Sequence, residues 1–153
     1  MTAHAGVASI TDTTYAISAS LPATYDSAGY GATTITYTAI GSVSQMTPYG
    51  SKRDVMKFQP IAGAVEKVKG APDYGEGDMQ MADIPANAGQ VILKAAEASA
   101  NHYSLKITYS DGEIHYLDVL VSSWSLSGGS EGQPLIRTAT LNICKAPVVV
   151  AAS

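Results

Sequence analysis

Residues 105–117 read LKITYSDGEIHYL and carry the clearest structural signal of the chain. Asp111-Gly112 is typical of a two-residue type I′ turn, because both central positions of that turn need a positive φ. The flanking residues are rich in β-branched and aromatic side chains, as expected of paired strands. The turn predicts an antiparallel hairpin in which Ile107 faces Tyr116, an aromatic and β-branched pair worth about 0.2–1 kcal/mol over alanine.

Alternating apolar and polar side chains predict further strands on both sides of this hairpin. The strand after the turn continues to Trp124 and is apolar on both faces in its middle, which indicates a central strand covered on both sides. A second hairpin is expected over 65–81, with its turn region at 70–77. The remaining strands are expected at 15–20, 34–45 and 135–144.

One amphipathic helix is predicted over 85–99, where apolar side chains recur at the spacing of one helix face. That face holds Ala88, Val91, Ile92, Ala95 and Ala96, and the opposite side holds Gln90, Lys94 and Glu97. Asp83 and Asn87 are both suitable N-caps. The chain is therefore expected to be mainly β with one flanking helix.

Length and composition predict a single domain over 1–153, because 14% charged and 46% hydrophobic residues are far from disordered compositions. The formal charge of −4 argues against a protein that grips nucleic acid by counterion release. Cys144 is the only cysteine, so neither an intrachain disulfide nor a cysteine-based zinc site is expected. Residues 1–20 lack the pattern of a secretory signal, and the apolar run 148–152 is too short to cross a bilayer, so no membrane partner is expected.

Three segments lack a regular pattern. Residues 1–12 are small and polar, and we expect a flexible N-terminal arm. Residues 46–64 mix prolines, glycines and charges without a clean period, and we expect a long loop, a kind of segment that is usually functional or ordered by a neighbour. Residues 146–153 are expected to form a C-terminal tail.

No pattern of residues predicts catalysis, a metal or a cofactor. His115 and Asp118 are three apart on a predicted strand, so their side chains point to opposite faces and cannot form a base with its orienting carboxylate. The carboxylates are scattered, and no pair has the spacing expected of glycosidase chemistry. We therefore expect a protein that is not an enzyme and holds no cofactor.

Short turn and strand motifs follow one another along residues 13–145. They are ATYDSAGY at 23–30, IGSV at 40–43, Tyr-Gly at 49–50, the segment 68–75 before a strand, Ala-Gly-Gln at 88–90, the Asp-Gly hairpin, and Leu-Asn-Ile at 141–143. In this order and spacing the chain resembles the major tail tube proteins of long-tailed, siphovirus-like bacteriophages. It departs from that family's pattern at Asn87, where an acidic residue is expected, and in its apolar C-terminal tail.

The resemblance implies a β-sandwich with one flanking helix, six copies in a ring with a shared inner β-barrel, and rings stacked into the conduit through which the genome leaves the capsid. If each subunit gave four strands, ~24 strands at about 4.8 Å spacing would give a backbone diameter near 37 Å, which is wide enough for duplex DNA. The implied partners are further copies of the chain, a tape measure protein, tail tip and terminator proteins, and double-stranded DNA in passage. The implied location is the virion tail, assembled in the host bacterial cytoplasm.

A tube that lets DNA slide should offer few cations, and six copies at −4 each give a ring of −24. The lumen is expected to be lined by polar side chains that alternate with apolar ones, namely Ser42, Ser44, Glu66, Asp78 and Gln80. Ring stacking is assigned to the loop residues Pro48, Tyr49, Lys52, Arg53 and Asp54, whose cations are expected to pair with carboxylates of a neighbouring subunit. The subunit contact is assigned to the N-terminal arm and to the helix residues Val91, Lys94 and Glu97.

The sequence is also compatible with three other functions. A secretion-system tube of similar fold would deliver proteins, and a lumen without net negative charge would favour it. A stand-alone carbohydrate-binding module would need Tyr25, Tyr30 and Trp124 on one exposed platform. A small hydrolase would depend on His115.

Overall fold

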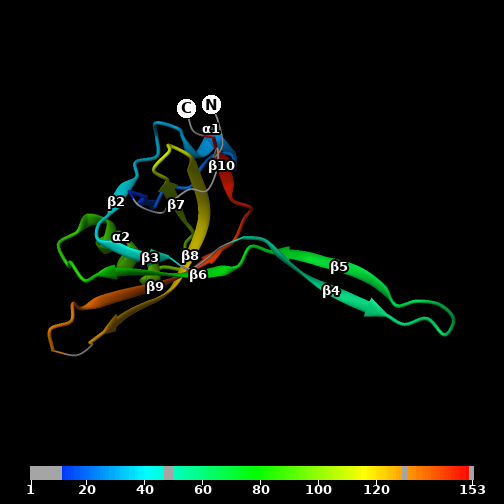
Figure 1. The fold of residues 1–153 in the computed structure, drawn as a ribbon. Helices are drawn as coiled ribbons and strands as arrows, with labels where there is room; N and C mark the ends of the chain where they lie inside the picture. Colours follow the sequence, from blue (N-terminus) through cyan, green and yellow to red (C-terminus); the bar gives the residue numbers. More distant parts are fainter. Residues whose placement is uncertain (1–11, 47–49, 129–130, 152–153) are drawn as a thin grey trace.

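The computed structural model describes residues 12–46, 50–128 and 131–151, and shows a mainly antiparallel β protein with a flanking helix, as predicted (Figure 1). The residues assigned to the N-terminal arm lie outside the described residues up to position 11. The elements in chain order are β1 Thr14–Ser18, α1 Ser27–Tyr30, β2 Thr38–Ile40, β3 Val43–Met46, β4 Lys52–Phe58, β5 Glu66–Asp73, β6 Glu76–Ala82, α2 Ala88–Ala98, β7 Tyr103–Thr108, β8 Ile114–Ser127, β9 Ile136–Ile143 and β10 Val148–Val150.

The main sheet has the strand order β2-β1-β7-β8-β9-β6-β3, with β10 also paired to β8. Strand β8 divides this sheet in two, because its first half pairs with β7 and β10 whereas its second half pairs with β9. A register shift between Val121 and Ser123 lies within the half that pairs with β9, and such bulges bend a strand and increase its twist. Figure 1 shows β8 as the long curved strand that runs the height of the body.

The two end strands of the main sheet, β2 and β3, follow one another in the chain. They are joined at Gly41-Ser42, where Ser42 has a φ of 59°, a left-handed conformation that ends a strand. The prediction of one strand over 34–45 is therefore wrong: the chain bends at this point and changes from one end of the sheet to the other.

The core lies on one face of the main sheet and is covered by α2. Its members are apolar side chains from six strands and the helix, among them Ile17, Ile40, Met79, Met81, Leu93, Ala96, Leu105, Ile107, Leu117, Val119, Ala139 and Leu141. On β8, β9 and β6 these side chains alternate with more polar ones, which is the period of a half-buried strand. The sheet therefore presents a second face, away from the core.

The hairpin of β7 and β8 forms with a register one residue away from the predicted one. Ile107 faces His115, and Leu105 faces Leu117. Of the two turn residues only Gly112 has a positive φ, so the turn is a three-residue loop in which Gly112 N donates to Tyr109 O at 2.9 Å, and not a type I′ turn. The predicted register would have set Leu105 opposite Asp118, whereas the observed one places two fully buried leucines together.

The segment 46–64 is not a loop, because residues 52–58 form β4 and pair antiparallel with β5. These two strands make a separate sheet that projects from the body as a long arm (Figure 1). The predicted hairpin over 65–81 is wrong for the same reason, since β5 pairs with β4 whereas β6 pairs with β3 and β9. The arm is inserted in the connection between the hairpin strands β3 and β6.

The face of β7 and β8 opposite the core is covered by the segment that contains α1. Tyr30 is buried there and stacks on Tyr116 with ring centroids 5.2 Å apart. Tyr25 and Tyr37 complete a cluster of four tyrosines. The segment predicted as a C-terminal tail contains a strand, β10, which pairs with the first residues of β8 in this part of the body.

Helix α2 is held against the sheet by amide side chains at its N-terminus. Asn87 is the N-cap, and its Oδ1 accepts hydrogen bonds from Gln90 N at 3.1 Å and Gly41 N at 3.2 Å. Gln90 is 2% exposed, so its expected place on the polar side of the helix is wrong. Gly89 lets the helix approach β2, since a Cβ there would clash with the carbonyl of Ala39.

Gln90 satisfies three backbone groups that would otherwise be buried without partners. Its Nε2 donates to Ala82 O at 2.8 Å and to Gly41 O at 3.2 Å, and its Oε1 accepts from Ile84 N at 3.0 Å. These bonds join α2 to the end of β6 and to the bend between β2 and β3.

Gln90→Ala should lower the free energy of unfolding by more than about 2 kcal/mol, because each buried backbone group left without a partner costs roughly 1–3 kcal/mol. Urea unfolding followed by circular dichroism measures the loss. The control Glu97→Ala alters an exposed position of the same helix and should stay within about 0.5 kcal/mol of the wild type. Equal stability of the two variants would contradict this role of Gln90.

Tyr30→Phe should increase resistance to alkaline unfolding. Burial, with a contribution from the Asp118 carboxylate, raises the pKa of Tyr30 above its ordinary value, so the unfolded state ionises first as the pH rises above about 10. The stabilisation that comes from keeping this phenol neutral is therefore fully present below about pH 10 and is lost progressively as the pH rises further.

The measurement is the midpoint of alkaline unfolding, which should rise in Tyr30→Phe. Stability at pH 8 should change little, because the Tyr30 hydroxyl has no hydrogen-bond partner among the described residues. The control Tyr25→Phe, at a tyrosine that is 43% exposed, should leave the midpoint unchanged. A midpoint that falls in Tyr30→Phe would contradict the assignment.

Candidate functional site

His102 and His115 each lie beside a carboxylate, and neither pair is the one considered from the sequence, His115 with Asp118. His102 Nδ1 lies 3.0 Å from Asp118 Oδ1, and His115 Nε2 lies 2.8 Å from Glu113 Oε1. His115 is therefore paired with Glu113, and Asp118 is paired with His102. Among residues 12–46, 50–128 and 131–151, no three side chains of the metal-binding types gather in one place, and no helix is long and apolar enough to cross a membrane.

A polar surface covers the face of β3, β6, β9 and the second half of β8 that points away from the core. We call it the polar sheet face; besides Leu120 and Ile136 it carries nine polar residues, Gln45, Glu76, Asp78, Gln80, Ser123, Ser125, Thr138, Thr140 and Asn142. Directly opposed residues of antiparallel strands share a face, as Asp78 and Thr140 do here. This surface contains two carboxylates and no Lys or Arg.

Hydrogen bonds between side chains hold the polar sheet face in place. Thr140 Oγ1 donates to Asp78 Oδ1 at 2.8 Å, and Asn142 Nδ2 donates to Ser122 Oγ at 2.9 Å. Such bonds reduce the freedom of the polar groups to reach other ligands. The two bonds link side chains of β9 to side chains of β6 and β8.

Three of the five residues expected in the lumen come together at this surface. Asp78 and Gln80 belong to it, and Ser44 Oγ donates to Gln80 O at 3.3 Å at its edge. Ser42 is exposed at the bend between β2 and β3. Glu66 lies on the arm, in a different sheet from the other four.

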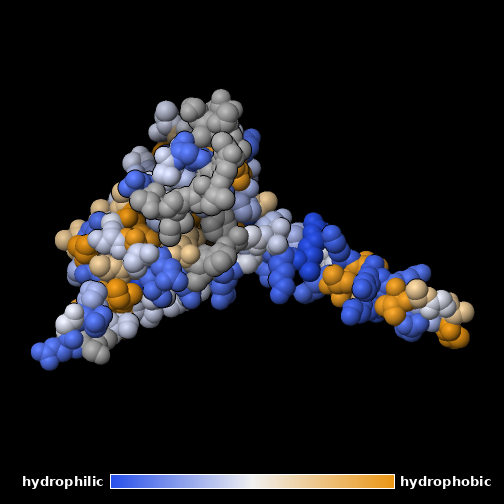
Figure 2. All heavy atoms as spheres, in the orientation of Figure 1, coloured by the Kyte–Doolittle hydropathy of each residue, from blue (hydrophilic) through white to orange (hydrophobic). Residues whose placement is uncertain are grey.

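The arm, residues 52–73, has two different faces. Phe58 stands opposite Glu66 and Met56 opposite Val68, and these pairs share one face because they are two residues apart along each strand. The other face carries Lys57 opposite Lys67 and Val55 opposite Lys69. Both kinds of side chain are exposed, and Figure 2 shows hydrophobic and hydrophilic residues alternating along the projecting ribbon.

The apolar face of the arm lacks a partner within the described part of the chain. Phe58 is 65% exposed, Met56 59% and Val68 58%. A two-stranded ribbon is marginally stable in water by itself. Exposed apolar side chains on such a ribbon are typical of a protein contact surface.

The charges of the chain are divided between arm and body. The arm holds five of the nine basic residues and three of the thirteen acidic ones, which gives it a net charge of +2. The rest of the chain therefore carries a net −6. This asymmetry favours contact between the arm of one copy and the body of another.

The predicted stacking residues lie at the base of the arm as far as the structure describes them. Lys52, Arg53 and Asp54 begin β4 and are exposed, and Arg53 Nη1 lies 3.5 Å from Gly70 O. Pro48 and Tyr49 lie outside the described residues. The pattern of residues 46–64 did not predict the apolar and basic faces further along the arm, although Lys67 and Lys69 have the two-residue spacing of one strand face.

The expected contact residues of α2, Val91, Lys94 and Glu97, are all exposed on the outer side of the helix. The aromatic platform of a carbohydrate-binding module does not form. Tyr30 is buried and packs against Tyr25 and Tyr116. Trp124 lies beside α2 at the pocket; it is eight residues along β8 from Tyr116, which is about 26 Å along the strand.

No protein-family model matches the sequence, and no curated protein matches it. Solved structures do match over nearly the whole chain. The sheath/tube terminator of an extracellular contractile injection system, PVC, has a TM-score of 0.69 at 8% identity and covers 97% of this chain and 100% of its own. A chain of the anti-feeding prophage baseplate has a TM-score of 0.64 at 12% identity and covers 99% and 98%.

The tail tube of SPP1 also matches, with a TM-score of 0.61 at 12% identity over 95% of this chain and 80% of the tube protein. All of these neighbours come from tail or injection assemblies. At such low identity the likeness establishes the fold: this chain has the fold shared by tail tube proteins and tube terminators.

Proposed function

We propose that the chain is a structural subunit of a phage tail tube, which polymerises as stacked hexameric rings and conducts DNA. The observation that carries the proposal is the polar sheet face on four adjacent strands, opposite a continuous core. Four strands per subunit is the number that a 24-stranded inner barrel of six copies requires. Joining the edges of neighbouring sheets would also remove exposed strand edges.

In this proposal the polar sheet face lines the lumen. Glu76 and Asp78 give it negative charge, and the absence of Lys and Arg from its nine polar residues prevents tight phosphate binding. The Thr140 hydroxyl and the Asn142 amide already donate to neighbouring side chains, which reduces the number of donors available to base edges. DNA would therefore pass without being held.

The arm would make the contact between rings. It projects away from the body, its apolar face is exposed and its net charge is opposite to that of the body. The outer side of α2 would contact a neighbour within the assembly. Tape measure, terminator and tail tip proteins would be the further partners of such a tube, and the virion tail its location.

A conduit of a contractile injection system is the second candidate, since neighbours of this fold come from such systems. The polar sheet face distinguishes the two functions, because a negatively charged and cation-free lumen is suited to DNA. This charge favours the phage tube.

Purified full-length protein should form rings or tubes with a central hole when it is concentrated. Electron microscopy measures this, and a map should place Asp78 and Gln80 on the inner wall. A protein that stays monomeric at all concentrations, or a tube with this face outside, would overturn the proposal.

Gln80→Lys should leave assembly intact and make the tubes retain duplex DNA, because each ring gains six cations in the lumen. Retention should be strong near 50 mM salt and fall steeply by 200 mM, as expected of phosphate contacts. DNA that co-sediments with tubes is the measurement. Asn101→Lys adds the same charge at an exposed position away from the polar sheet face and is the control; equal retention by both variants would argue against a lumenal Gln80.

A further inference from the structure

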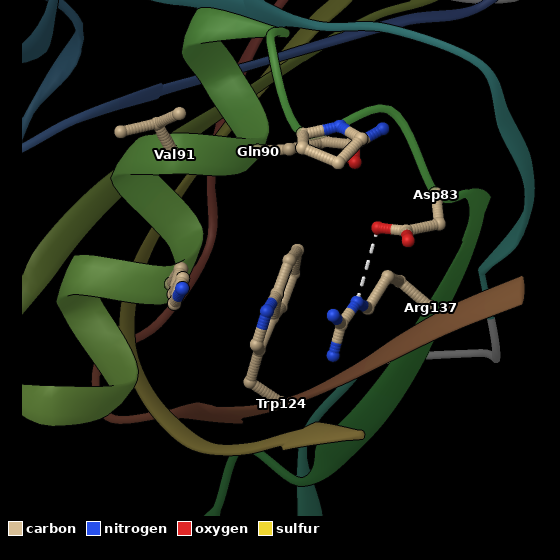
Figure 3. Close-up of a pocket in the computed structure, with 7 residues that line it drawn as sticks. Asp83, Gln90, Val91, Trp124 and Arg137 are labelled. Carbon is tan, nitrogen blue, oxygen red and sulfur yellow. Dashed lines mark hydrogen bonds and ion pairs between the residues drawn. The ribbon is translucent and has the colours of Figure 1, made fainter. Parts of the chain in front are cut away.

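A pocket of about 190 Å³ opens between α2 and the ends of β8 and β9 (Figure 3). Trp124 forms its wall, Val91 and Lys94 of α2 line one side, and Arg137 lies over the Trp124 ring with its guanidinium carbon 5.3 Å from the ring centroid. The Arg137 Nε donates to Asp83 Oδ1 at 3.1 Å. The pocket therefore combines an aromatic wall with a cationic rim.

Exposed apolar side chains surround this pocket. Val91 is on its helix side, and Leu126 shares the face of Trp124 on β8 and stands opposite Arg137. Ile84 and Leu135 adjoin it, because Asp83 N donates to Leu135 O at 3.0 Å and Ile84 follows in the chain. Exposed apolar side chains beside a pocket are typical of a protein contact surface.

We propose that this pocket receives the arm of a second copy of the chain, with Phe58 entering beside Trp124 and Glu66 pairing with Lys94. The inference rests on the proposed tube function and names the surface that accepts the arm. The occupant is another copy because the arm projects away from the side of the body that carries α2 (Figure 1).

Size and polarity match between pocket and arm. A cavity of about 150 Å³ holds a benzene ring, so one of about 190 Å³ accommodates the ring of Phe58. Met56 and Val68 share the face of Phe58 and would cover the exposed apolar side chains beside the pocket. Burying an aromatic anchor in a pocket is the usual source of affinity at an interface.

Charge also matches. Glu66 is directly opposite Phe58 on the arm, so a carboxylate accompanies the aromatic anchor. Lys94 at the pocket forms no ion pair within the described chain, whereas Arg137 is already bonded to Asp83. Glu66 likewise has no ion-pair partner among the described residues, so the two charges are available to each other.

Photo-crosslinking tests the contact in the full-length protein. Benzoylphenylalanine in place of Phe58, in a mixture of unlabelled and ¹⁵N-labelled copies, should give crosslinks between copies that map to residues 83–94 or 124–137. The matched control carries the same group in place of Val55, on the opposite face of β4, and should not react there. Crosslinks from position 58 that map elsewhere would overturn the proposal.

Charge reversal gives the second test. Glu66→Lys and Lys94→Glu should each raise the concentration needed for assembly at least tenfold, and the double variant should restore it. The emission of Trp124, the only tryptophan, should shift to shorter wavelength on assembly and fail to shift in Phe58→Ala.

The outcomes separate this inference from the proposed function. Tubes that form normally in Phe58→Ala, Glu66→Lys and Lys94→Glu would overturn the pocket assignment and leave the tube function standing. A wild-type chain that neither assembles nor crosslinks would overturn both.

Discussion

The fold depends on the amide hydrogen bonds at the N-terminus of α2. The two ends of the main sheet are joined only by the bend at Gly41-Ser42, and both backbone groups of Gly41 are held by α2, its N–H by Asn87 and its carbonyl by Gln90. Gln90 also binds the end of β6 through Ala82 O. Without these bonds the helix would lose its fixed place over the core and the sheet its defined ends.

This arrangement separates the surfaces of the molecule by function. The core and α2 occupy one side of β6, β9 and the second half of β8, so the other side is free to carry polar groups. The arm grows from the connection between β3 and β6, the same strands that carry part of the polar sheet face.

Much of the body could be predicted from the sequence because local patterns determine it. The alternation of Ala139, Leu141 and Ile143 predicted β9 and its buried face, and the helical spacing predicted α2 to within a few residues. The hairpin register could not be predicted, because Asp-Gly is compatible with both a two-residue and a three-residue loop and the pairing of Leu105 with Leu117 decides between them.

The errors at the candidate site have a common cause, which is that partners distant in sequence determine the outcome. The helical spacing placed Gln90 on the solvent face of the helix, but its side chain is buried and donates hydrogen bonds to the carbonyls of Gly41 and Ala82. Residues 65–69 alternate as a strand should, and the pattern gives no information about whether β4 or β6 is the neighbour. The alternation placed Asp78 and Gln80 on one polar face of β6, as the structure shows, whereas Glu66 follows the same alternation but lies on the arm.

The charge division between arm and body limits the kinds of assembly that the chain can form. The arm carries +2 and the rest −6, and the proposed acceptor pocket beside α2 is a different surface from the arm. Where such a contact between unlike surfaces is not exchanged reciprocally by two copies, it is heterologous, and its repetition closes a ring or grows a filament. Because the arm projects beyond its own body, each copy added to the assembly would present a further arm and a further acceptor surface. The proposed stacked rings would satisfy this requirement, because each ring would offer all its arms in one direction and all its acceptors in the other.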